Sequence, residues 1–149
     1  MPDLRSRIAR EADVPLLLAM MESFNLLEGI DWDVHAKEPA LRTLLREREL
    51  GLVALLEGPD GPFGYYVLTW GYDLEWNGRD AFLTELFLVP SARGKGNGAH
   101  ALELLESLAR KHGARALHLM VRHENIVARR LYMGHGYRSP ERLFLSKEL

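Results

Sequence analysis

Apolar side chains recur at two different periods along this chain, and the succession of the two periods predicts an α/β fold. Short alternating or continuous apolar runs predict six strands, over residues 4–10, 52–56, 63–72, 81–89, 116–121 and 142–146. Helical spacing predicts four helices, over residues 16–27, 39–49, 96–112 and 125–133. This order places an antiparallel meander before one parallel strand–helix–strand crossover.

Local turn chemistry supports these boundaries. Asp13 stands at the N-cap position of the first helix, with Pro15 in its first turn. The run from Gly58 to Pro62 predicts a tight turn, and Asn77-Gly78 predicts the next hairpin. No internal repeat or linker interrupts the pattern, so we expect a single domain over residues 1–149.

Composition narrows the class of protein. The 149 residues are 47% hydrophobic and 27% charged, which is ordinary for a globular domain with its own core. The net charge of −2 does not indicate a nucleic-acid-binding protein, which would usually be basic. No apolar run is long enough to span a membrane. Without cysteine there is no disulfide or thiolate metal site, and without a signal-peptide pattern we expect a cytoplasmic location.

The segment from Arg93 to Gly98 carries the most specific chemistry. It joins the strand predicted over residues 81–89 to the helix predicted from residue 96, and it holds three glycines and two cations. Glycines let backbone N–H groups approach an anion closely, and the start of a helix adds partial positive charge. Arg93 and Lys95 add full charges. The segment therefore predicts a site for a phosphate-bearing cofactor.

Two other interpretations of this loop remain. The spacing Gly94-x-Gly96-x-x-Ala99 fits a relaxed dinucleotide-binding fingerprint, but that loop normally follows the first strand of a longer fold. Here only about fifty residues follow, enough for roughly one more strand–helix unit and a hairpin. A glycine-rich turn without a ligand is the second alternative.

Two ordered motifs give the chain a family resemblance. The first is Leu88-x-Pro90-x-x-Arg93-x-x-Gly96-x-Gly98, and the second comprises Asn125, Ala128, Leu131, Tyr132, Gly136 and Tyr137. Over nearly its whole length the chain resembles the GNAT superfamily of acyl-CoA-dependent N-acetyltransferases, and residues 63–90 loosely resemble its bacterial small-amine and diamine branch. The resemblance implies a mixed, mostly antiparallel twisted sheet of six to seven strands with about four helices. It also implies that the fourth and fifth strands splay apart.

The same resemblance implies acetyl-CoA as co-substrate and assigns the residues that would hold it. The pantetheine arm would pair with the backbone of Phe87, Leu88 and Val89, and Asn125 would bond the arm near the last helix. The pyrophosphate would lie on the backbone amides next to Arg93. Those amides belong to Gly94, Lys95, Gly96, Asn97 and Gly98.

Acetyl transfer to an amine needs a base for the amine and an acid for the leaving thiolate. By resemblance, Tyr132 is the acid. Glu85, in a strand otherwise apolar around it, suits the base, either directly or through an ordered water; Thr84 replaces it if a bulge shifts the alternation. His100, His118 and His123 are more simply structural. No group of histidines and carboxylates has metal-ligand spacing, so no metal is expected.

The expected acceptor site combines carboxylates with aromatic rings, which suits a cationic amine. Its candidate residues are Glu28, Asp31, Trp32, Tyr65 and Trp70. We expect acetyl transfer from acetyl-CoA to a small cationic primary amine, with no nucleic-acid or membrane partner. A protein N-terminus or lysine as acceptor, or a non-catalytic acyl-CoA-binding module, are the alternatives. The apolar run Leu143-Phe144-Leu145 favours a homodimer through the late strands, as in many relatives, or else a core strand.

Overall fold

In the computed structural model, which describes residues 3–149, one mixed sheet carries five strands in the order β1-β2-β3-β4-β5. Adjacent strands are antiparallel except β4 and β5, which are parallel and are joined through a helix. The mixed α/β sheet was predicted; a count of six to seven strands is wrong for the described chain. The strands are β1 (Arg5–Ile8), β2 (Gly51–Gly58), β3 (Gly61–Asp73), β4 (Gly78–Leu88) and β5 (Leu117–Leu119).

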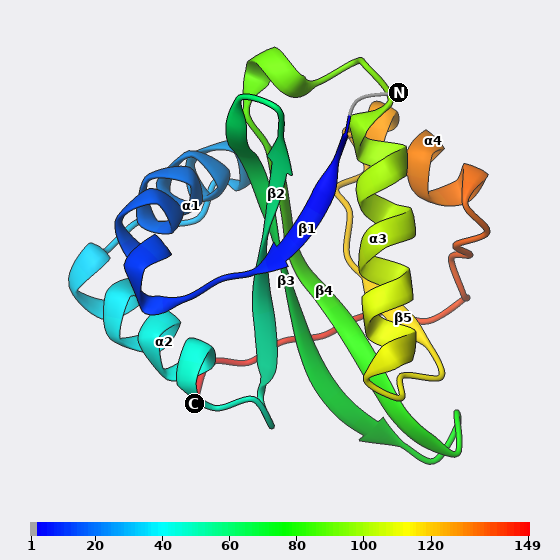
Figure 1. Cartoon of the computed structure of the whole chain (residues 1–149). Helices are drawn as coiled ribbons and strands as arrows, with labels where there is room; N and C mark the ends of the chain where they lie inside the picture. The colour runs from blue at the N-terminus through cyan, green and yellow to red at the C-terminus, as the bar shows by residue number, and fades with distance from the viewer. Residues whose placement is uncertain (1–2) are drawn as a thin grey trace.

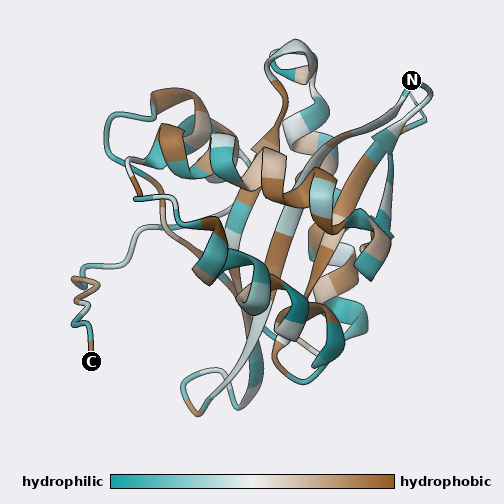
Figure 2. Cartoon of the chain, turned by 90° about the vertical axis from the view of Figure 1, so that its left-hand side faces the viewer, coloured by the Kyte–Doolittle hydropathy of each residue, from teal (hydrophilic) through white to brown (hydrophobic). Residues whose placement is uncertain are grey.

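Helices cover both faces of this sheet (Figure 1). Within residues 3–149 there are four α-helices, as predicted: α1 (Val14–Glu28), α2 (Val34–Arg46), α3 (Asn97–Lys111) and α4 (Ile126–Gly134). The helices α1 and α2 lie on one face, and α3 and α4 lie on the other. Each face has its own core, and the fully apolar run Leu52–Leu56 of β2 contributes alternate side chains to both. Figure 2 shows hydrophobic residues, in brown, along the strands and along the helices.

The second helix begins earlier than predicted. It starts at Val34 because Asp33 caps it, its Oδ1 accepting the N–H of His35 at 3.0 Å. The prediction placed the start near Pro39. Pro39 instead lies inside α2, where its missing N–H removes one backbone hydrogen bond.

The strand predicted over residues 142–146 does not form, which corrects the prediction. After α4 the chain continues without regular structure, and Figure 2 shows this tail standing away from the rest of the chain. Side chains attach it: Arg142 forms a bidentate pair with Glu75 at 2.8 and 3.1 Å, and Phe144 lies 6.1 Å from Phe82. An apolar run supplies strand propensity, but a strand also needs a neighbouring edge in register, which this tail lacks.

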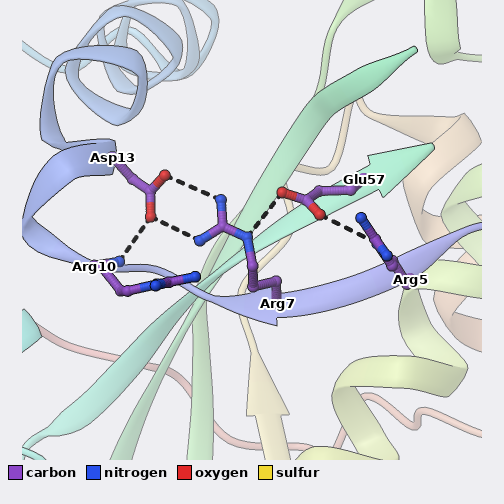
Figure 3. A network of polar contacts seen from close by, with 5 residues as sticks. All are labelled: Arg5, Arg7, Arg10, Asp13 and Glu57. Carbon is purple, nitrogen blue, oxygen red and sulfur yellow. Dashed lines mark hydrogen bonds and ion pairs between the residues drawn. The ribbon is translucent and has the colours of Figure 1, made fainter. Parts of the chain in front are cut away.

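A polar network secures the outer edge of the sheet (Figure 3). Glu57 of β2 accepts from Arg5 at 3.2 Å and from Arg7 at 2.8 Å, both on β1. Arg7 also donates both terminal nitrogens to Asp13, whose carboxylate accepts the backbone N–H of Arg10. Asp13 does occupy the N-cap position of α1, but its side chain binds Arg7 instead of capping that helix. The network fixes the entry into α1.

Candidate active site

The strand β4 loses its β5 partner halfway along its length. The two strands pair only where Ala81–Leu83 face Leu117–Leu119, and β4 then continues to Leu88. The strand β5 is therefore shorter than the predicted 116–121. Beyond Leu83, one edge of β4 is open.

Backbone alternation identifies the residues that face this open edge. The Val89 N–H donates to the Phe63 carbonyl at 2.9 Å, so Val89 is directed toward β3, and Phe87, two residues earlier, shares that direction. Because successive residues of an antiparallel strand direct their backbone groups to opposite sides, those of Leu86 and Leu88 face the opening. Of the three residues predicted to hold an extended arm, the structure places the backbone of Leu88 there.

The open edge leads directly into the glycine loop. After a short 3-10 turn over Pro90–Ala92, Gly94 and Gly96 adopt left-handed backbone angles, with φ of +72° and +80°. The helix α3 then starts at Asn97 with no side chain capping its first turn, so the N–H groups at its start are free to receive an anion. Lys95 is exposed beside them.

Two side chains shape this loop from within. The Asn97 amide donates to the Ala92 carbonyl at 2.9 Å and so closes the turn. Arg93 donates through Nε to the Leu88 carbonyl at 2.8 Å, with its guanidinium 5.5 Å from the centre of the Phe87 ring. Arg93 therefore lies at the junction between the open edge and the glycine loop.

Tyr132 lies on α4 and packs against the core of the α3 face, with its ring 5.8 Å from that of Tyr137. Burial, with a smaller contribution from the charge of Glu28, raises the pKa of Tyr132 to about 12. The phenol is thus protonated at neutral pH. Asn125 caps the same helix, its Oδ1 accepting the Ala128 N–H at 3.1 Å.

A β-bulge orients Glu85. Leu83 faces Leu68 and Glu85 faces Val67, so Thr84 is the extra residue in β4. Thr84 is exposed, whereas Glu85 is half-buried and accepts the Tyr65 hydroxyl on Oε1 at 2.7 Å. Tyr65 belongs to the core of the α1 and α2 face, so the Glu85 carboxylate is turned to that face.

Three acceptor candidates lie around the end of α1. Glu28 accepts the Arg122 Nε at 3.2 Å and also receives Arg122 on its backbone carbonyl. Its effect on the pKa of Tyr132 places these two groups within electrostatic reach of each other. Asp31 is exposed, and Trp32 packs under α1 and α2 with the Lys37 ammonium 6.0 Å from its ring.

The structure separates the remaining two acceptor candidates. Tyr65 is buried on the α1 and α2 face, whereas Trp70 lies on the α3 face. Trp70 stacks on His112 at 5.1 Å and donates its indole N–H to the Arg48 carbonyl at 3.2 Å. His112 follows the last residue of α3, so Trp70 is at the opposite end of that helix from the glycine loop. Trp70 is therefore not brought together with Trp32.

Of the three histidines considered in the sequence, His118 pairs through its ring with Asp80 at 3.0 Å. His123 contributes its backbone carbonyl to Arg129, and His100 lies in the first turn of α3. No group of three potential metal-ligating side chains is found within residues 3–149. In that same range, no helix is long and apolar enough to cross a membrane.

The sequence analysis did not identify two residues that border the site, Leu86 and Arg122. Leu86 could have been found, since it lies two residues before Leu88 and alternation gives both the same backbone direction. Arg122 carried no local signal, because its contact with Glu28 joins segments far apart in the chain.

Comparison with known proteins agrees with this architecture. The family model described as "Acetyltransferase (GNAT) family" matches residues 17–137. The uncharacterised N-acetyltransferase YhfO of Bacillus subtilis (strain 168) is 30% identical over 132 residues, covering 88% of this chain and 87% of that protein.

Solved structures share the fold. An integron cassette protein from the Cole Harbour Salt Marsh metagenome has a TM-score of 0.84 and 31% identity over 97% of this chain and 90% of its own. A predicted acetyltransferase of Clostridium acetobutylicum, solved with acetyl-CoA, has a TM-score of 0.79 at 18% identity, covering 99% of this chain and 96% of its own. The chain belongs to the GNAT acetyltransferase family.

Proposed function

We propose that this member of the GNAT family transfers an acetyl group from acetyl-CoA to a primary amine. The observation that carries the proposal is the continuity of the open β4 edge with the glycine loop. Coenzyme A has amide groups along one arm and a pyrophosphate at its end. The backbone groups of Leu86 and the N–H of Leu88 face the open edge and suit the amides, while the Leu88 carbonyl accepts from Arg93. The start of α3 with Lys95 suits the pyrophosphate. The acetyl-CoA bound to the Clostridium acetobutylicum protein, which has the same fold, supports this assignment.

The chain's own residues supply the proton transfers. Glu85 accepts a proton from the acceptor ammonium, directly or through water, so that the amine nitrogen can form the new C–N bond. Tyr132 donates its phenolic proton to the sulfur as the C–S bond breaks, and the nitrogen now bonded to the acetyl carbon passes its second proton to the phenolate, directly or through water. The proton held by Glu85 then leaves to solvent. Its raised pKa keeps that proton in place at neutral pH until the thiolate develops.

The acceptor we propose is a small cationic amine. Support comes from Glu28 and Asp31 beside the end of α1. Glu28 is paired with Arg122, but both side chains are partly exposed, at 33% and 53%, so an incoming ammonium can exchange with the guanidinium at little cost. A protein N-terminus or lysine is the second candidate acceptor.

The test is a panel of polyamines, aminoglycosides, basic amino acids and neutral-bodied amines assayed with acetyl-CoA, with release of free thiol as the readout. We expect turnover of cationic amines, and Tyr132→Phe should lower kcat by about 10²-fold or more while acetyl-CoA affinity stays within twofold. Tyr137→Phe, which also removes one phenol from the same end of the molecule, is the control. Binding of acetyl-CoA without turnover of any amine would favour a non-catalytic module.

A further inference from the structure

Tyr65 has no exposed surface, although its sequence pattern suggested contact with the acceptor. Its relative exposure is 0%, and its ring lies 5.9 Å from that of Phe87 in the core beneath α1. A side chain so enclosed cannot reach a substrate unless the core opens. The tyrosine hydroxyl nevertheless needs a partner, because burying an unpaired hydroxyl is costly.

That partner is the carboxylate of Glu85. The Tyr65 hydroxyl donates to Glu85 Oε1 at 2.7 Å, from the neighbouring strand β3. Within residues 3–149, Glu85 forms no ion pair with a lysine, arginine or histidine. Tyr65 is thus the titratable side chain in contact with it.

The direction of this hydrogen bond is fixed by the surroundings. Burial first, and then the negative charge of Glu85, raise the pKa of Tyr65 far above its ordinary value. The phenol therefore stays protonated and acts only as a donor. A donor held on one carboxylate oxygen restricts the rotation of the Glu85 carboxylate and leaves Oε2 for another partner.

We propose that Tyr65 is a positioning residue: its buried hydroxyl holds Oε1 of Glu85 so that Oε2 faces the acceptor nitrogen or a bridging water. This inference rests on the proposed function, in which Glu85 is the base. Tyr65 acts through Glu85 and does not touch the reacting atoms.

The chain offers a matched control in the next residue. Tyr66 is also 0% exposed, but it points to the other face of the sheet, where its hydroxyl pairs with the Ser6 hydroxyl at 2.6 Å. Tyr65→Phe and Tyr66→Phe therefore each remove one buried hydroxyl from adjacent positions of β3. They differ in whether that hydroxyl reaches Glu85.

The pH dependence of kcat/KM separates the two variants. Loss of the hydrogen bond changes the surroundings of the carboxylate, so Tyr65→Phe should move the acidic limb of the profile. We expect kcat at pH 7 to fall about tenfold while KM for acetyl-CoA stays within twofold. Tyr66→Phe should leave the profile in place. An unchanged acidic limb in Tyr65→Phe overturns the inference.

Two further measurements distinguish a positioning role of Tyr65 from a general loss of stability, and one of them does not require an active enzyme. In a Glu85→Gln background, adding Tyr65→Phe should cause no further loss of kcat; an equal additional loss means that Tyr65 acts by another route. NMR of ¹³C-labelled glutamate carboxyls, with Glu85 assigned through Glu85→Gln, should show a different carboxyl chemical shift for Glu85 in Tyr65→Phe than in the wild type, and no difference in Tyr66→Phe. An unchanged Glu85 signal in Tyr65→Phe refutes the positioning role even if the enzyme is active, whereas an inactive wild type refutes the proposed function alone.

Discussion

The glycine loop can be tested by separating its backbone strain from its role as an anion site. Gly96 has φ of +80°, and a Cβ added there meets nothing within 4 Å. Gly113, at the other end of α3, has φ of +86° and the same empty surroundings. Alanine at either position is forced into the left-handed region, which costs about 1–2 kcal/mol, partly offset by roughly 0.4–1 kcal/mol from a less flexible unfolded chain.

The two variants should therefore lose similar stability, about 1 kcal/mol each, in urea denaturation without ligand. Their affinities for acetyl-CoA should differ. Under the proposed function, a methyl group at Gly96 crowds a phosphate held at the start of α3, and we expect binding about tenfold weaker, equivalent to about 1.4 kcal/mol. Gly113→Ala should bind as the wild type does. Calorimetry that finds equal affinity in all three proteins would refute the loop as a phosphate site.

Two more predictions concern Arg93 and Asp13. Arg93→Ala should weaken acetyl-CoA binding at least tenfold. It should leave S-acetylpantetheine, which has no pyrophosphate, bound at least as tightly, because the Leu88 carbonyl is released. Equal losses of affinity for both ligands in calorimetry would contradict this. Arg7 lowers the pKa of Asp13 from 3.8, so the pair stabilises the fold above that value and less as pH falls through and below it. Asp13→Asn should cost about 2 kcal/mol at pH 7 and much less near pH 2, with Asp60→Asn in the exposed β2–β3 turn changing stability by under about 0.5 kcal/mol.

Elements that rest on local sequence were the most predictable. The third helix was predicted to within one residue at each end, and the strand before it to within three residues at its start and one at its end. Both rest on signals inside the segment itself, namely apolar periodicity and glycines at the boundaries. The start of α2 was missed because two local signals competed, and the Asp33 cap prevailed over Pro39. The C-terminal strand was missed for a different reason, since pairing depends on an edge that no local pattern describes.

The candidate site divides in the same way. Tyr65 and Trp70 lie an odd number of residues apart in β3, and side chains alternate between the two faces of a strand. The sequence alone therefore places them on opposite faces of the sheet, as the structure does. In contrast, the bond between Tyr65 and Glu85 depends on the pairing of β3 with β4 and on the bulge between them. The acceptor candidates were grouped only because they are acidic or aromatic. Such a grouping detects neither the opposite faces of Tyr65 and Trp70 nor the bond between Tyr65 and Glu85.

One irregularity in β4 accounts for both halves of the proposed site. The last residue of β4 that pairs with β5 is Leu83, and the extra residue of the bulge is Thr84, immediately after it. The bulge turns Glu85 toward the α1 and α2 face, while the end of pairing leaves the backbone of Leu86 and Leu88 without a β5 partner. In the proposed reaction, the base and the edge that receives the acetyl donor are thus positioned by the same two residues. Without the extra residue, every later side chain of β4 would lie on the other face of the sheet, which would remove the contact of Glu85 with Tyr65 and the orientation of the proposed base.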